Sequence, residues 1–362
     1  MMGRALRAEQ FSADEISIIH VTQRCVRRAF LCGHDSQSGR NFDHRRQWIR
    51  DRLEWLASIF GIDCLTYTVM SNHIHLILRS RPDIVRNWSD EEVALRWLRL
   101  FPVRRDCRGK PAQPSESELN QILLDPVRLA ELRLRLSDIS WWMRCTAENI
   151  ARRANKEDQV TGHFWEGRYK AQPLLDEAAL LACAMYVDLN PVRAAIAETP
   201  EQSLYTGAQD RIDDLKRHRQ RRSSSKTPAR PRQWERKNRL RRKSGWMSPV
   251  QIDERQDPAG PDQCQSGRRA SAKGFLSITL TRYLELLDWT GRQLKRHKPG
   301  SIPDHLAPIL QRLGIEPTSW CFLVRRFGQI FKRVAGNADS VSREAQRRGQ
   351  YWIHAPGVAC LR

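Results

Sequence analysis

The stretch from Tyr67 to Arg79, YTVMSNHIHLILR, has the pattern of a β-strand with two histidines near its middle. Side chains alternate between the two faces of a strand, so His73 and His75 project to one side while Ile74 and Leu76 project to the other. Two interpretations follow from this pair. The histidines are hydrogen-bonded residues beside a core, or they are metal ligands, because imidazole is the side chain that most often binds metals.

The segments around this strand predict an alternation of strands and helices. In chain order they are a strand at 16–22, a helix at 44–60, a strand at 62–69, the histidine strand, a helix at about 138–155, a strand or hairpin within 162–175 and a helix after Asp176. This order suits an antiparallel or mixed sheet with helices packed on one face. We therefore predict an α+β fold.

The helix after Asp176 ends in AMYVDLNPVRA, residues 184–194. Tyr186 and Asn190 stand four residues apart, which places them on one helix face about a turn from each other. Tyrosine can act as a nucleophile, and an asparagine carbonyl can bind a hard cation such as Mg²⁺ or Mn²⁺. The structural alternative is a core aromatic residue and a polar residue that ends the helix before Pro191.

Two segments together favour the catalytic interpretation. SNHIHLIL, followed by GHFWEGRYKAQPLLDEAALLACAMYVDLNPVRA, resembles the REP-associated tyrosine transposase family of single-tyrosine HUH transposases. The resemblance covers roughly residues 11–200, and YVDLNPVRA is its most specific part. It implies a ferredoxin-like βαββαβ core that cleaves and rejoins single-stranded DNA. The chain departs from a compact core of this kind through a long insertion at about 80–137.

The resemblance also implies roles for individual residues. His73 and His75 would bind the divalent metal, Mg²⁺ or Mn²⁺, and Asn190 would be the third ligand, where related enzymes often have glutamine. Tyr186 would attack the phosphodiester to give a 5′-phosphotyrosine intermediate. Tyr169, in WEGRYK, is the rival nucleophile by location, but position 173 is proline, so Tyr169 has no polar helix partner four residues on.

Basic and aromatic residues near these segments are candidates for DNA contact. Arg168, Lys170 and Arg193 could bind backbone phosphates, and Trp165 could stack on an extruded base. Each also has an ordinary interpretation as surface charge or core aromatic. The expected partner is single-stranded or hairpin DNA. The protein could also form a homodimer, in which the tyrosine would serve either the metal site of its own chain or that of the second copy.

The charge distribution points to a polyanionic partner. The chain has 362 residues and a net charge of +21, and the part between Lys216 and Lys243 holds fourteen Lys or Arg against one acid. We predict that residues 201–270 form a basic, disordered linker in which Trp234 and Trp246 could stack on bases transiently. Residues 271–362, which have amphipathic helical spacing, would form a small helical accessory domain.

The cysteines and the apolar runs indicate in which cellular environment the protein is expected. Nine cysteines occur without a C-x-x-C pair, which indicates neither a zinc ribbon nor a dithiol site. No apolar run approaches the roughly 20 residues that a membrane-spanning helix needs. We expect a cytoplasmic, nucleoid-associated protein with reduced core thiols.

Three functions remain in competition at this point. The first is a metal-dependent DNA strand transferase that uses Tyr186. The second is a non-catalytic, domesticated DNA-binding protein, and the third is a metal-dependent nuclease that uses the histidine pair with water as nucleophile. The intact set of His73, His75 and Tyr186 favours the first.

Overall fold

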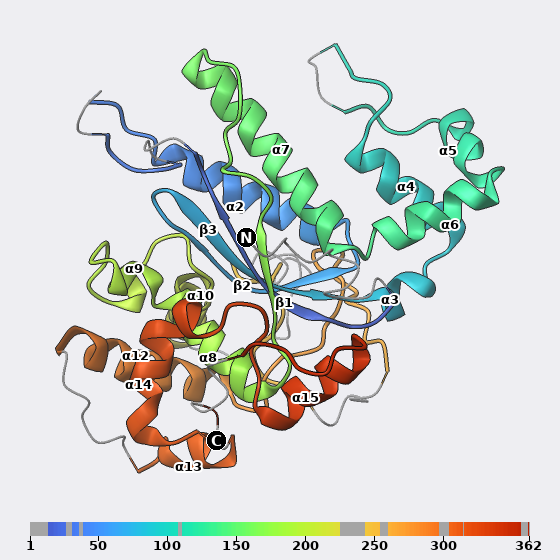
Figure 1. Cartoon of the computed structure of the whole chain (residues 1–362). Helices are drawn as coiled ribbons and strands as arrows, with labels where there is room; N and C mark the ends of the chain where they lie inside the picture. The colour runs from blue at the N-terminus through green and yellow to red at the C-terminus, as the bar shows by residue number, and fades with distance from the viewer. Residues whose placement is uncertain are drawn as a thin grey trace.

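The computed structural model describes residues 14–26, 31–35, 39–107, 111–224, 243–253, 260–296, 304–313, 315–355 and 361. Its centre is one four-stranded sheet (Figure 1). The strands are β1 (Ile18–Arg24), β2 (Ile62–Val69), β3 (His73–Ser80) and β4 (Lys170–Pro173). They lie in the order β2-β3-β1-β4, and all three neighbouring pairs are antiparallel. The predicted α+β class is confirmed.

One face of the sheet is covered by two long helices. These are α2 (His44–Ala57) and α7 (Ile139–Asp158), which cross this face side by side in Figure 1. The side chains of Ile74, Leu76 and Leu78 belong to the apolar core under these helices, as strand alternation predicts. That core leaves His73 and His75 on the opposite face.

The opposite face is covered as well, so the prediction of helices on one face is wrong. It carries α8 (Glu177–Asp188), which contacts β2 and β3, and α8 is in turn packed against α14 (Pro317–Ile330). A second apolar core unites Leu65 and Ile77 of the sheet with side chains of α8, α12 (Leu280–Arg296) and α14. The nearly continuous apolar sequence of α8 fits this position, because a helix that is apolar all round is buried on all sides.

The insertion predicted at about 80–137 is helical. It consists of α3 (Pro82–Arg86), α4 (Asp90–Leu100), α5 (Glu116–Leu123) and α6 (Pro126–Arg135). Figure 1 shows α4, α5 and α6 gathered at one end of the molecule, on the side of α2 and α7. The insertion therefore extends the first face and leaves the histidine face untouched.

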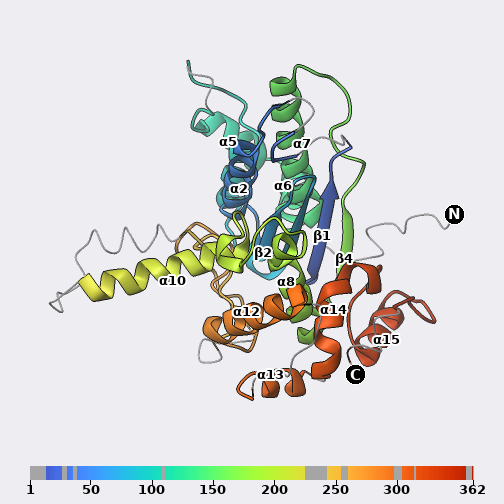
Figure 2. The same ribbon diagram turned by 90° about the vertical axis from the view of Figure 1, so that its left-hand side faces the viewer.

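The predicted disordered linker at 201–270 is wrong at both of its ends. It begins with a 3₁₀ turn, η1 (Pro200–Gln202), and a long helix, α10 (Gly207–Ser224), which projects from the body of the protein in Figure 2. The most basic stretch, 225–242, lies outside the described residues. Trp246 is fully buried against Tyr67, at 5.2 Å between ring centroids, so it cannot stack on a base, and Trp234 also lies outside the described residues.

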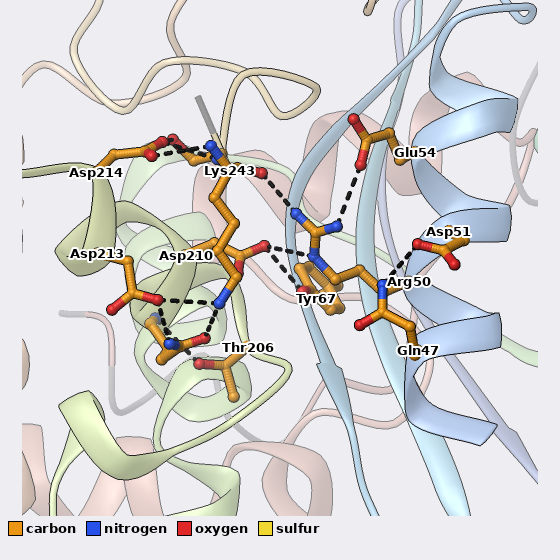
Figure 3. Close-up of polar contacts among 12 residues, drawn as sticks. Gln47, Arg50, Asp51, Glu54, Tyr67, Thr206, Asp210, Asp213, Asp214 and Lys243 are labelled. Carbon is orange, nitrogen blue, oxygen red and sulfur yellow. Dashed lines mark hydrogen bonds and ion pairs between the residues drawn. The ribbon is translucent and has the colours of Figure 1, made fainter. Parts of the chain in front are cut away.

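A buried polar cluster fixes the first turns of α10 to the sheet and to α2 (Figure 3). Asp210 accepts hydrogen bonds from Arg50 Nε at 3.1 Å and from Tyr67 Oη at 3.0 Å. The chain returns to the same place at Lys243, whose carbonyl accepts from Arg50 and whose backbone N–H donates to Asp214. Burial raises the pKa of Asp210, while the positive charges of Arg50 and Lys243 oppose that shift.

The C-terminal segment, 271–362, contains the predicted helices. After α12 come α13 (Ala307–Arg312), α14 and α15 (Ala338–Arg347), and a short helix, α9 (Asn190–Arg193), follows α8. The apolar side chains of α12, α13 and α14 share one core with α8, and α12 contacts α9. Val341 and Ala345 of α15 belong to a small separate cluster. The segment thus packs directly on the central structure. It is not the separate accessory domain that the sequence predicts.

The cysteines and the helices agree with the sequence on two further points. Among the described residues eight cysteines are free thiols, six of them buried. None of the described helices combines the length and the apolar character needed to cross a bilayer.

Candidate active site

The face of the sheet toward α8 carries a row of polar side chains. In the antiparallel register Thr22 lies opposite His75, Arg24 opposite His73, and Gln172 opposite His20. Residues directly opposite each other share a face, so strands β1, β3 and β4 all contribute to one polar surface. The prediction that His73 and His75 project together is confirmed.

His75 is held by two neighbours on β1. Its Nδ1 lies 3.0 Å from Nε2 of His20 and 3.1 Å from Oγ1 of Thr22. The rings of His20 and His75 are stacked, at 5.2 Å between centroids and 10° between planes. Both rings are almost fully buried, so these contacts fix the orientation of His75.

His73 is held by its own neighbour in sequence. Its Nδ1 lies 2.6 Å from Oδ1 of Asn72, and a side-chain carbonyl can only accept a hydrogen bond. The proton of a neutral His73 is therefore on Nδ1, and Nε2 keeps its lone pair. In both histidines Nδ1 is engaged by the protein, which is the usual arrangement for an imidazole whose other nitrogen binds a metal.

The histidines are neutral at physiological pH. Burial lowers the pKa of His20 to about 4, while the hydrogen bond that His20 donates to the amide oxygen of Gln172 favours the charged form. Burial, with help from the charge of Arg24, lowers the pKa of His73 to about 4. Burial also holds the pKa of His75 well below its ordinary value, and nearby His20, His73 and Arg193 act in the same direction. Metal binding requires neutral imidazole, so these shifts favour it.

Tyr186 reaches the same place from α8. Asp176 caps this helix by accepting a hydrogen bond from Ala179 N at 2.8 Å, as predicted. The ring of Tyr186 stands edge-on to His75 at 5.5 Å between centroids and edge-on to His20 at 5.9 Å. The sequence separates Tyr186 from His75 by more than a hundred residues, and the fold brings the two rings into contact.

Helix α14 forms the other wall around the tyrosine. The ring of Phe327 lies 5.8 Å from that of Tyr186, and a Cβ atom on Gly328 would lie only 2.9 Å from the phenol oxygen. The tyrosine hydroxyl therefore rests against the backbone of α14 at a position where only glycine leaves room. The guanidinium of Arg193 covers the ring of Tyr186 at 4.6 Å from its centroid.

A cavity of about 710 Å³ opens between these groups. Its lining includes the three residues that the sequence predicted to meet, namely His73, His75 and Tyr186. Four basic side chains also line it: Arg24 of β1, Arg168 just before β4, Lys170 of β4 and Lys332 just after α14. The cavity is thus an open, positively charged site with two imidazoles and a phenol on its walls.

Asn190, one of the three predicted metal ligands, is placed differently from the residues that line the cavity. Asn190 is buried, its Nδ2 has no hydrogen-bond partner, and it is not one of the residues that line the cavity. Within the described parts of the chain no three His, Cys, Asp or Glu side chains form a ready metal cluster. A metal at His73 and His75 would therefore need further ligands from an amide, water or substrate.

The aromatic candidates near the site belong to a neighbouring cavity. Trp165 is buried in the first core and donates from Nε1 to the carbonyl of Ala147 at 2.9 Å. Tyr169 is buried too, and its hydroxyl is hydrogen-bonded to Ser140 at 3.0 Å. Both line a second cavity beside α7 and neither lines the histidine cavity, so the geometry favours Tyr186 over Tyr169 as the residue paired with the histidines.

Several residues of the site were not singled out from the sequence. They are His20, Thr22, Gln172, Phe327, Gly328 and Lys332. A signal existed for His20, since a lone histidine in the apolar run ISIIHVT shares its strand face with Thr22. The residues of α14 had none, because their sequence looks like that of any amphipathic basic helix.

The comparisons with known proteins add little to this geometry. No family model and no curated protein matches the chain. One solved structure, that of a REP-associated tyrosine transposase bound to a REP hairpin, aligns over 56% of this chain and 81% of that one, at 11% identity and a TM-score of 0.32. At these values the alignment carries no argument about function, which has to come from the site itself.

Proposed function

We propose that the protein is a metal-dependent transposase-type enzyme that cleaves and rejoins single-stranded DNA through Tyr186. The observation that carries this proposal is the shared cavity of Tyr186, His73 and His75. We assign the sheet to the ferredoxin-like arrangement, because the chain order β1-α2-β2-β3-α7-β4 and the strand order β2-β3-β1-β4 agree with βαββαβ.

Tyr186 would act as the nucleophile. Its phenol oxygen forms a bond to phosphorus as the bond from phosphorus to the 3′ oxygen breaks, which leaves a 5′-phosphotyrosine and a 3′ hydroxyl that takes up the proton. The new linkage is again a phosphodiester, so a second 3′ hydroxyl can displace the tyrosine and rejoin DNA without a further energy source. Arg168, Lys170 and Lys332 supply positive charge around the reacting phosphate.

His73 and His75 would hold the divalent metal through their Nε2 atoms. Asn190, four residues after Tyr186, is the proposed third ligand, and its amide would have to turn toward the cavity, which it does not line. A bound Mg²⁺ or Mn²⁺ supplies Lewis-acid polarisation of the scissile phosphate. Imidazole and amide ligands leave room for water and a phosphate oxygen on such a cation. Because one chain builds the whole cavity, the proposal places the tyrosine and the histidines of the same protomer together, with or without a homodimer.

The experiment that tests the function is covalent capture of labelled DNA. The protein is incubated with single-stranded hairpin DNA and Mn²⁺ or Mg²⁺, then separated under denaturing conditions. We expect a metal-dependent adduct with the wild type and with Tyr169→Phe, and none with Tyr186→Phe. Cleavage without an adduct would favour the nuclease that uses water, and binding with neither would favour a DNA-binding protein without catalysis.

A further inference from the structure

A chain of three buried side chains runs across strands β4, β1 and β3 behind the proposed metal-binding histidines. Oε1 of Gln172 lies 3.2 Å from Nδ1 of His20, and Nε2 of His20 lies 3.0 Å from Nδ1 of His75. All three residues line the cavity but are at most 6% exposed, so they are largely shielded from water. The position of the proton on each ring therefore depends on the donor or acceptor role of its neighbour.

The amide oxygen of Gln172 decides those positions. A carbonyl oxygen can only accept, so His20 must carry its proton on Nδ1. A neutral imidazole has one proton, and Nε2 of His20 is then an acceptor. Nδ1 of His75 is the nearest group that can donate to it, at 3.0 Å, whereas the hydroxyl of Thr22 lies at 3.5 Å. The shorter contact favours a proton on Nδ1 of His75, which leaves the lone pair of His75 on Nε2.

We propose that His20, oriented by Gln172, is a positioning residue that holds His75 in the Nδ1–H tautomer and so keeps its Nε2 free to bind a metal. The proposal rests on the function proposed above in one respect, namely that the free lone pair of His75 Nε2 binds the metal. Thr22 is compatible with the same state, since its hydroxyl, 3.1 Å from His75 Nδ1, can accept as well as donate. His73 reaches the same tautomer by a separate route, through Asn72.

The register of the sheet explains why these residues can form such a chain. Gln172 lies opposite His20, and Thr22 lies opposite His75, on one face of the sheet. His20 and Thr22 are two residues apart on β1, so both point to this face. A rigid sheet of three hydrogen-bonded strands sets the spacing, which is how a supporting group can fix the ring of a metal-binding histidine.

The test reads the tautomer directly in the metal-free protein by long-range ¹H–¹⁵N correlation of the histidine rings. The wild type should show His75 protonated on Nδ1. Gln172→Met keeps the length of the side chain but removes the acceptor, and Gln172→Glu keeps an acceptor. We expect the methionine variant to move the proton of His75 toward Nε2. The glutamate variant, at a pH where His20 is neutral, should leave it on Nδ1, although residue 172 does not touch His75.

A second variant and a binding measurement complete the test. His20→Phe retains an aromatic ring but no acceptor, and it should weaken Mn²⁺ binding measured by calorimetry by about 10- to 100-fold. The unchanged ring signals of the exposed His44 report that the fold is intact in each variant.

The proposal is overturned if wild-type His75 carries its proton on Nε2, or if neither Gln172→Met nor His20→Phe changes its tautomer. The two proposals fail separately. If an adduct forms on Tyr186 but the tautomer of His75 does not change in the variants, the positioning role is wrong and the transferase function stands. If the tautomers are as expected but no adduct forms, the transferase function is wrong and the positioning role stands.

Discussion

At the scale of the residue, the burial of three histidines ties the stability of the protein to pH. The unfolded chain protonates histidine at about pH 6.5, whereas burial lowers the pKa of folded His20 to about 4. Between these two values the unfolded state binds more protons than the folded state. The free energy of unfolding is therefore at its full value above pH 6.5 and falls as the pH decreases toward 4.

We expect metal-free wild-type protein to lose on the order of 3 kcal/mol of unfolding free energy across this window from His20 alone. Denaturant titrations at several pH values measure the loss. His20→Phe should show a shallower dependence, because it removes one of the groups that titrate. A wild type whose stability is the same at pH 7 and pH 4.5 would contradict the burial of these rings.

A sequence pattern can identify those site residues whose placement follows from the spacing of nearby residues in the chain. His73 and His75 share a strand face by the period of two, and Tyr186 stands in a helix with a recognisable ending, so all three could be named in advance. His20 carries no such local mark, because its role depends on Gln172 and His75, which lie 152 and 55 residues away along the chain. A hydrogen-bond chain across strands is visible only once the register is known.

At the scale of the element, α14 sets the position of the tyrosine hydroxyl. Gly328→Ala would place a methyl group 2.9 Å from the phenol oxygen and 3.3 Å from the carbon that bears it. The tyrosine must then move, and a displacement of about 1 Å can cost 100-fold in rate. We expect the rate of adduct formation to fall by about 10- to 100-fold, measured by a time course on labelled DNA.

The matched control is Gly291→Ala in α12, where the added methyl would meet only the end of the Leu189 side chain at 3.1 Å. This variant should keep a rate within a few-fold of the wild type. Equal rates for Gly328→Ala and the wild type would show that α14 does not hold the tyrosine during the reaction.

The anchoring of α10 is a second property of an element. Asp210 is fully buried and pairs with Arg50 and the hydroxyl of Tyr67 (Figure 3). Asp210→Ala would remove the acceptor of Arg50 Nε and of the Tyr67 hydroxyl. Glu54 and the Lys243 carbonyl would still contact the guanidinium. Loss of one partner of a buried ion pair typically destabilises a protein by about 3–5 kcal/mol. Chemical denaturation should show a loss of this size.

A surface ion pair provides the comparison for that loss. Asp288 and Arg292 are joined in α12 with 43% and 73% of their side chains exposed. Asp288→Ala should change the free energy of unfolding by less than about 1 kcal/mol. Similar losses for the two variants would mean that the Asp210 cluster is not the anchor of α10.

The elements that the sequence predicted well are those with a plain period. The histidine strand and the first two hundred residues have alternating or helical spacing, and the order of strands and helices follows it. For α10 the sequence predicts part of a disordered linker, because the composition of this segment is dominated by charge. Its anchor depends on Asp210 and Arg211, which are buried by pairing with distant groups, and composition does not distinguish them from solvated charges.

At the scale of the whole molecule, the C-terminal helices complete the fold around α8. Nearly every residue of α8 is buried, and its cover includes Tyr283, Phe327 and other side chains of α12 and α14. Tyr283 also donates a hydrogen bond to Asp188, at the end of α8. The tyrosine site therefore depends on a part of the chain that begins some ninety residues after it.

A shortened chain that ends at Ala270 tests this dependence. Removal of α12 and α14 would expose the apolar surface of α8, so we expect binding of a hydrophobic dye and association in sedimentation velocity. A shortened chain that stays monomeric, melts cooperatively and binds no dye would show that 271–362 is the independent accessory domain suggested by the sequence.

The position of 271–362 could not be predicted from the sequence. The spacing of an amphipathic helix shows which of its faces is buried, but it does not show which other element packs against that face. The same limit explains why helices were expected on one face of the sheet only. The apolar character of α8 on all sides was the available sign that something further covers it.

The most direct test of the proposed reaction is to locate the covalent bond. The adduct formed with single-stranded hairpin DNA and Mn²⁺ is digested with protease and nuclease, and the modified peptide is identified by mass spectrometry. The account predicts a nucleotide joined by its 5′ phosphate to Tyr186. A nucleotide on Tyr169 or on any other residue, or a DNA product cleaved with no modified peptide, would contradict it.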